Sequence, residues 1–113
     1  MRKLKGSWNL QNQINKIKGL ISIAKKANYI VFGADNLKNY NKKLYLLIKA
    51  NNAGKDIQKI CEKYIEFGID CIEFDFNDMQ NITNLDNCKI LGLKNKGLSE
   101  AILNIIRGES IGK

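Results

Sequence analysis

The chain contains no histidine, and this absence limits the chemistry that it can perform. Histidine is the usual general acid or base of enzymes and a common ligand of zinc. The three cysteines, Cys61, Cys71 and Cys88, are scattered, and none belongs to a Cys-x-x-Cys pair. A zinc site would therefore need carboxylates at irregular spacing to complete its ligand set. The sequence predicts no metal site, no cofactor and no catalytic centre, and we interpret the cysteines as reduced core residues.

Long apolar runs are also missing. No segment approaches the roughly 18 uninterrupted apolar residues that cross a membrane, and no apolar run follows Arg2, Lys3 and Lys5 as it would in a signal peptide. The chain has 113 residues, 44% of them apolar, and no low-complexity tract, which predicts one globular domain over residues 1–113. We expect a cytoplasmic protein without a membrane partner, we favour a monomer, and we expect residues 1–8 to be irregular.

Positive charge is concentrated in the first half of the chain. Residues 1–60 contain thirteen basic and two acidic residues, a net charge of +11. Residues 61–113 contain six basic and nine acidic residues, a net charge of −3, so the whole chain carries +8. A basic half is typical of proteins that bind a polyanion, although lysines can also simply keep a surface soluble. We interpret the asymmetry as favouring a nucleic-acid partner.

The order of apolar patterns predicts alternating helices and strands. Apolar residues three and four positions apart predict long helices at about residues 9–27, 56–67 and 98–106. Short apolar runs predict strands at residues 29–32, 43–50, 70–75 and 88–93. The second strand should be interior and buried on both faces, and residues 77–87 should form a short helical turn and a polar loop. The pattern predicts an α/β fold, a three-layer α/β/α sandwich with a central four-stranded mixed sheet.

The segment Tyr29–Asn41 combines a strand, a glycine and the start of a short helix. Gly33 permits a backbone turn that a residue with a Cβ resists. Asp35 or Asn36 can cap the helix, whose first turn presents backbone N–H groups. Phosphates and base edges can bind at such a place, although every α/β domain also needs glycine turns and capped helices. Because ligands of open sheets bind at strand ends, we expect this segment to lie near two polar loops, at residues 51–54 and 77–87.

Three segments carry a resemblance to a known family: the helical stretch Asn15–Ala27, the strand and turn Val31–Asn36, and the strand Leu44–Ala50. Together they resemble the kink-turn-binding ribosomal proteins, the seven-A-e and thirty-e type of large-subunit protein. The chain is most similar to the small bacterial YlxQ-like branch, over about residues 9–106. The resemblance implies the same α/β/α sandwich and a non-catalytic protein that binds structured, kink-turn-like RNA, in particular ribosomal RNA.

The family contacts sheared G·A pairs of a kinked RNA stem through a Gly-x-Asn-Glu-x-x-Lys signature at the start of its second helix. Gly33 matches the glycine. The positions of the asparagine, glutamate and lysine are occupied here by Asp35, Asn36 and Asn39. An aspartate repels phosphate but can accept a hydrogen bond from a guanine edge. Lys38 and Lys42, beside Asn39, can restore the lost positive charge in a shifted register.

A second family pattern, Leu-Gly-x-Ala-x-Gly, precedes the last strand. Its positions are occupied here by Met79, Gln80, Ile82 and Asn84, so both glycines are replaced. The predicted set of RNA-contacting residues combines the two patterns with the lysines that end the first helix: Gly33, Asp35, Asn36, Lys38, Asn39, Lys42, Lys25, Lys26, Met79 and Ile82. Tyr40 can either stack on a base or pack half-buried.

Two other functions fit parts of the sequence. A related sandwich is appended to RNA methyltransferases, but this chain has neither a phosphate-loop lysine motif nor a glycine-rich cofactor fingerprint, which argues against an enzyme. The second alternative is a protein-interaction module that has lost RNA recognition and whose basic half binds an acidic protein. Its anchors would be exposed apolar residues of the polar loop: Met79, Ile82 and Leu85. Burial of these side chains would remove the main support for that alternative.

Overall fold

In the computed structural model, which describes residues 7–107 and their side chains from residue 12, helices and strands alternate as expected. The helices of this part of the chain are α1 (Ser7–Lys26), α2 (Ala34–Asn39), α3 (Lys55–Glu66), α4 (Phe76–Thr83) and α5 (Lys96–Ile106). Its strands are β1 (Ile30–Phe32), β2 (Leu46–Ala50), β3 (Asp70–Phe74) and β4 (Ile90–Leu93). The expected irregular segment over residues 1–8 lies mostly outside the described residues, and α1 already includes residues 7 and 8.

The four strands form one mixed sheet in the order β1-β4-β2-β3. β4 pairs antiparallel with both β1 and β2, whereas β2 and β3 are parallel. β2 is therefore an interior strand, and three of its residues in a row, Leu46, Leu47 and Ile48, are fully buried. β3 is a sheet edge with exposed positions at Asp70 and Glu73. The predicted interior strand and the predicted shorter, more exposed strand are both confirmed.

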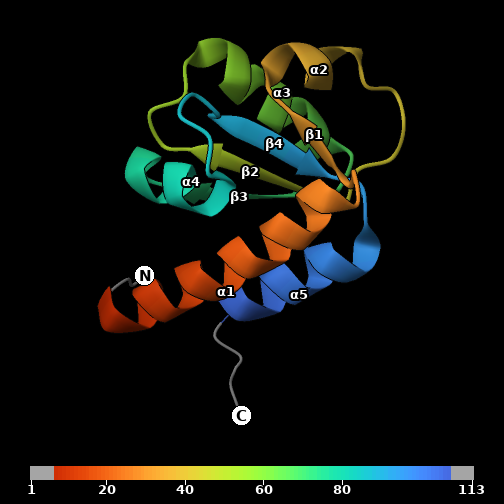
Figure 1. Cartoon of the computed structure of the whole chain (residues 1–113). Coiled ribbons are helices and arrows are strands. Elements are labelled where there is room, and N and C mark those ends of the chain that lie inside the picture. The colour runs from red at the N-terminus through yellow and green to blue at the C-terminus, as the bar shows by residue number, and fades with distance from the viewer. Residues whose placement is uncertain (1–6, 108–113) are drawn as a thin grey trace.

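Helices cover both faces of the sheet, as Figure 1 shows. We call α1, α4 and α5 the first layer and α2 and α3 the second layer. Side chains of β2 alternate between the two faces, so that Leu46 and Ile48 pack under the first layer and Leu47 packs under the second. The predicted three-layer α/β/α sandwich is confirmed.

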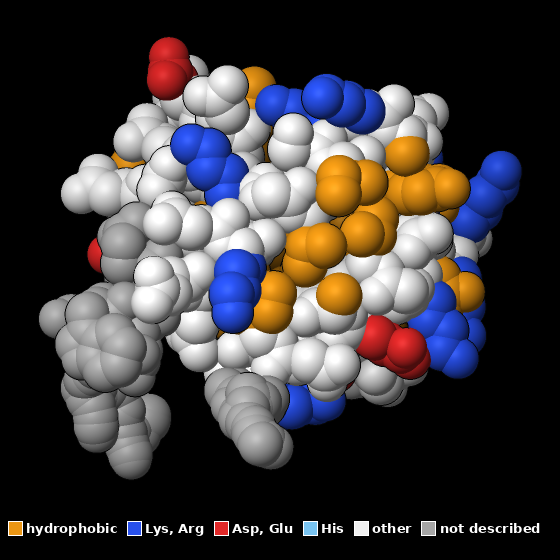
Figure 2. All heavy atoms as spheres, turned by 60° about the horizontal axis from the view of Figure 1, so that its bottom comes forward, with side chains coloured by type: hydrophobic (Ala, Val, Ile, Leu, Met, Phe, Trp, Pro, Cys, Tyr) orange, Lys and Arg blue, Asp and Glu red, His pale blue; other side chains and the backbone are white. Residues whose placement is uncertain are grey.

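α1 buries the stripe that its three- and four-residue periodicity predicts. Ile14, Ile17, Ile21 and Ala24 are fully buried against the sheet and the neighbouring helices. The outer face of the first layer, seen in Figure 2, carries a band of apolar side chains with basic side chains and one acidic group around it. No helix among residues 7–107 is long and apolar enough to cross a membrane.

The predicted helical turn and polar loop over residues 77–87 are both present, and the turn is a two-turn helix, α4 (Phe76–Thr83), with the loop after it. The Asp75 carboxylate caps α4 by accepting a hydrogen bond from the backbone N–H of Asp78 (2.8 Å). Met79 and Ile82 face the core, three residues apart on one side of the helix. The cap and the two buried side chains outweigh the weak helix propensity of this segment, so the helix is longer than the single turn that its composition predicts.

Candidate nucleic-acid interface

The start of α2 is held by the backbone of Gly33. Its N–H donates to the carbonyl oxygen of Ile90 (3.0 Å) in β4, and its own carbonyl accepts from the N–H of Leu37 (3.1 Å). Gly33 has φ +88° and ψ 155°, a region that only glycine adopts without strain. Gly33 is thus the N-cap residue, and the prediction that Asp35 or Asn36 caps α2 is wrong. The Asn36 amide instead donates backwards to the carbonyl oxygen of Phe32 (2.7 Å).

Gly33 lies beside the loop that follows α4. Together the two segments line a shallow hollow of about 320 Å³, which we call the glycine hollow: Phe32, Gly33, Leu85, Asp86, Asn87 and Cys88. Burial raises the pKa of the Cys88 thiol, so this side chain is uncharged at neutral pH. The predicted proximity of the Gly33 segment to the second polar loop is confirmed. The loop at residues 51–54 does not line the hollow; Asn51 instead hydrogen-bonds to the carbonyl oxygen of Phe74 at the β3 edge.

Asn84 shapes the loop that borders the glycine hollow. It ends α4 in the left-handed region, with φ +57° and ψ 34°, and its N–H donates to the carbonyl oxygen of Gln80 (2.8 Å). Asparagine adopts this conformation more readily than other residues with a Cβ. The Lys25 ammonium donates to the carbonyl oxygen of Thr83 (3.1 Å), which ties the end of α1 to the end of α4. Lys25 is therefore half-buried and partly structural, whereas Lys26 is exposed.

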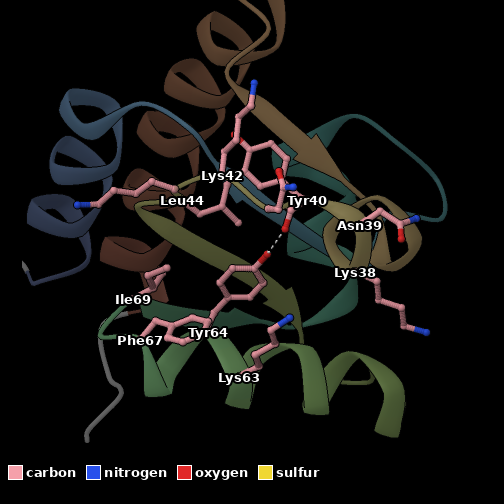
Figure 3. A pocket seen from close by; sticks show the side chains of 11 residues that line it. Lys38, Asn39, Tyr40, Lys42, Leu44, Lys63, Tyr64, Phe67 and Ile69 are labelled. Carbon is pink, nitrogen blue, oxygen red and sulfur yellow. Dashed lines mark hydrogen bonds between the residues drawn. The ribbon is translucent and has the colours of Figure 1, made fainter.

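A second hollow lies at the opposite end of α2. It has a volume of about 500 Å³, and we call it the lysine hollow. Figure 3 shows its lining, which comes from residues 38–44 and from the end of α3: Lys38, Asn39, Tyr40, Asn41, Lys42, Lys43, Leu44, Lys63, Tyr64, Phe67 and Ile69. This separate hollow thus contains Lys38, Asn39 and Lys42, which were predicted to share one interface with Gly33. α2 has six residues, so the two hollows are about 9 Å apart along its axis.

Tyr64 forms the floor of the lysine hollow. Its side chain is buried, and its hydroxyl lies 3.2 Å from the carbonyl oxygen of Leu37 and 3.4 Å from that of Tyr40. Burial, and to a smaller extent Tyr40, raises the pKa of Tyr64, so the hydroxyl remains a proton donor. The contact joins α3 to the end of α2. Tyr40 is half-buried as one alternative predicted, and it also lines the hollow.

Met79 and Ile82 are not available to a partner. Their exposed fractions are 0% and 2%, and both pack in the core of the first layer. They are removed from the set of RNA-contacting residues, because a buried side chain cannot touch a ligand. Of the three proposed protein-docking anchors only Leu85 is exposed, at 38%. The protein-interaction alternative therefore loses two of its three anchors and keeps Leu85.

Sequence reasoning missed most of the lining of the lysine hollow, including Lys63 and Phe67. Phe67 follows Tyr64 by three residues, a spacing that predicts an inward-facing side chain. It is 69% exposed because α3 ends at Glu66 and the chain turns at Gly68, which has φ +86°. Ile65, which the three- and four-residue spacing of residues 56–67 places on the inward face of the predicted helix, is also exposed. The signal that could have revealed Phe67 is its position directly before the glycine that ends the helix.

The described residues contain no cluster of three cysteine or acidic side chains that could hold a metal ion. No family model matches the chain, and no curated protein is significantly similar to it in sequence. Among solved structures, a protein of unknown function from Bacillus halodurans superposes with a TM-score of 0.69. The match covers 81% of this chain and 97% of that protein at 18% sequence identity. A likeness at this level of identity shows a shared fold and carries no information on function.

Proposed function

We propose that this protein is a non-catalytic RNA-binding protein that recognises a kinked, structured RNA, in particular ribosomal RNA, at the glycine hollow. One observation carries the proposal: of the three positions where the kink-turn family has glycines, Gly33 and Asn84 both have positive φ, whereas Gln80 is part of α4. Gly33 and Asn84 flank the two segments that meet at the hollow. Asn84 thus replaces a glycine without changing the backbone conformation that a glycine would supply.

Exposed lysines support the proposal, although they do not stand at the position where the family has its signature lysine. Lys26, Lys38 and Lys42 are exposed, and within residues 12–107 the only ion pair joins Lys49 to Glu73. Lysines without an acidic partner can neutralise phosphates and release their counterions. The family's lysine position is occupied by Asn39, so in this proposal Lys38 and Lys42 contact the phosphates beyond the kink.

Fluorescence anisotropy with two labelled RNA stems tests the proposal. One stem contains a kinked internal loop with two sheared G·A pairs, and the other has G·C pairs at the same positions. We expect the kinked stem to bind at least about tenfold more tightly, a difference of about 1.4 kcal/mol. Lys38→Gln and Lys42→Gln should each reduce the slope of log affinity against log salt by about 1. Lys16→Gln, which removes an exposed lysine of α1, is the matched control.

The conservative variant Asn84→Gly should keep the affinity for the kinked stem, because glycine also adopts the left-handed conformation. Equal affinity for the two stems would contradict recognition of the kink. Affinity that does not fall with salt would contradict phosphate contacts altogether.

A further inference from the structure

We propose that the lysine hollow binds an unpaired nucleotide of RNA, with its base against the ring of Phe67 and its flanking phosphates among Lys38, Lys42 and Lys63. The choice of RNA as the partner rests on the proposed function, but the hollow is separate from the glycine hollow. It would give the protein a second contact on the same RNA, about 9 Å along α2 from the first.

The charge of the lysine hollow selects an anion. Four lysines line it, and none of the described residues in its lining is acidic: Lys38, Lys42, Lys43 and Lys63 are the charged members. A neighbouring depression shares Lys43 and Phe67 with the hollow and adds Lys96. Lys43 is partly engaged, because its ammonium lies 5.3 Å from the centre of the Tyr45 ring. The uncompensated positive charge of the other lysines attracts a polyanion and not a neutral ligand.

The ring of Phe67 selects a planar group. Among the described side chains it is the most exposed large apolar residue, although exposure to water is unfavourable for an aromatic ring. Its edge-to-face contact with Tyr64 (6.5 Å between ring centres, interplanar angle 78°) supports one side of the ring. The hydroxyl of Tyr64 in turn donates to the carbonyl oxygens of Leu37 in α2 and of Tyr40 directly after it. An aromatic ring that is positioned by its neighbours and largely open to solvent is a stacking platform for a base.

The combination of lysines and an exposed ring distinguishes an unpaired nucleotide from other anions. Bases within a duplex stem are stacked and paired, and cannot reach a side chain in this way. An acidic peptide would engage the lysines but would leave the ring of Phe67 without a partner. The volume of about 500 Å³ lies within the range of about 300–1,000 Å³ that small-ligand sites have.

The test measures the affinity of the full chain for three fluorescein-labelled RNAs: the kinked stem, the kinked stem with a 3′ tail of adenosines, and a free octa-adenosine strand. An abasic strand of the same length and charge and a poly-glutamate peptide serve as competitors. The variants are Phe67→Ala and Phe67→Trp. Ile65→Ala is the matched control, because Ile65 is also exposed on α3 and does not line the hollow.

We expect octa-adenosine to bind and the abasic strand and the peptide to compete poorly. Phe67→Ala should weaken octa-adenosine binding by about fivefold to a hundredfold, whereas Phe67→Trp and Ile65→Ala should keep it. The tail should increase the affinity of the kinked stem, and Phe67→Ala should remove that increase. Lys63→Gln should weaken binding of the abasic strand and of octa-adenosine equally, with Lys59→Gln as its control.

The outcomes separate this inference from the proposed function. If the kinked stem binds but the tail adds nothing, or if Phe67→Ala leaves octa-adenosine binding unchanged, the inference is overturned and the proposed function stands. If octa-adenosine binding depends on Phe67 but the kinked stem is not preferred, the inference stands and kink recognition fails. If poly-glutamate displaces octa-adenosine as effectively as unlabelled octa-adenosine does, the hollow binds acidic protein segments and the inference is overturned.

Discussion

The two helical layers of the sandwich differ in size and in the way their helices begin. The core under the first layer contains Met79, Phe74 and seven isoleucines, whereas the core under the second layer is about half as large. α4 and α5 of the first layer are capped by the side chains of Asp75 and Asn95. α2 and α3 of the second layer begin at Gly33 and Gly54 without a side-chain cap. Both hollows border α2. The first layer thus covers most of the buried core, and the second layer carries the helix end and the lysines that the proposed RNA interface uses.

The first prediction tests whether stability is concentrated in the first layer. Ile17 is 0% exposed in α1 and Ile60 is 7% exposed in α3. Ile17→Ala should lower the free energy of unfolding by about 3–4 kcal/mol and Ile60→Ala by about 2 kcal/mol, because a site near the surface relaxes more easily around the lost volume. Urea unfolding followed by circular dichroism measures both. Equal losses would show that the two layers contribute alike.

The second prediction concerns the close approach of α2 to the sheet. A Cβ on Gly92 of β4 would lie 2.9 Å from Cδ1 of Leu44 and 3.0 Å from Cδ2 of Leu37. Gly92→Ala should therefore destabilise the protein by about 1–3 kcal/mol, since these side chains must move and α2 with them. Gly19→Ala is the control: nothing lies within 4 Å of the new Cβ on α1, and this change should stabilise by up to about 1 kcal/mol. If Gly92→Ala leaves the free energy of unfolding unchanged, α2 can shift away from the sheet without a loss of stability.

The third prediction compares the cysteines of the two layers. In the second layer, the thiol of Cys61 and the ammonium of Lys49 lower the pKa of the half-buried Cys71. Burial raises the pKa of Cys88 in the first layer. A lower pKa places the thiolate of Cys71 at lower pH, so at neutral pH iodoacetamide should alkylate Cys71 about tenfold faster than Cys88. Cys61 should also react slowly, because its hydrogen bond with Cys71 and its burial raise its pKa.

Mass spectrometry of the alkylated peptides between about pH 6 and pH 9 gives these rates. Lys49→Met should slow the reaction of Cys71, because the variant removes the positive charge beside it and leaves Glu73 unpaired. If Cys88 reacts as fast as Cys71, the first layer opens more readily than its larger core suggests.

Periodicity was enough to predict the fold. The stripe Ile14, Ile17, Ile21 of α1 and the apolar run of β2 each follow from burial on one or both faces. Local composition was a poorer guide where tertiary contacts decide the structure. Residues 77–87 contain four asparagines and predict only a helical turn and a loop, yet the buried side chains of Met79 and Ile82 support a helix over residues 76–83. The predicted helix also ran one residue past the end of α3 at Glu66, and Ile65, which its spacing places on the inward face, is exposed.

The candidate interface was predictable only in part. Gly33 stood out because its place between a strand and a helix requires a special backbone conformation. The long-range contact of Tyr64 with the end of α2 creates a second hollow. That hollow contains Lys38, Asn39 and Lys42. Tyr64 and the end of α2 are separated by more than twenty residues, and no local pattern records that contact. The pairing of Lys63 and Phe67 with those lysines was hidden for the same reason.

The last prediction exchanges the helix caps of the two layers. Asn95→Ala removes the oxygen that accepts the N–H of Leu98 (2.9 Å) and should cost about 1 kcal/mol of unfolding free energy. Gly54 has an extended backbone (φ −76°, ψ −178°) that any residue can adopt, and a Cβ there would meet nothing within 4 Å. Gly54→Ser should therefore stabilise the protein by about 0.5–1 kcal/mol, through a new cap and a less flexible unfolded chain.

The same substitution at the other uncapped helix should act in the opposite direction. Gly33→Ser forces a side chain into a glycine-only conformation and should destabilise by about 1–3 kcal/mol. Urea unfolding of the three variants measures these changes. Gly54→Ser should leave the RNA affinity unchanged. If Gly33→Ser lowers the RNA affinity of the folded protein as well as its stability, the two glycine caps differ in their role. The cap of α3 is then a place where stability can still be gained, and the cap of α2 is retained because the site requires its backbone.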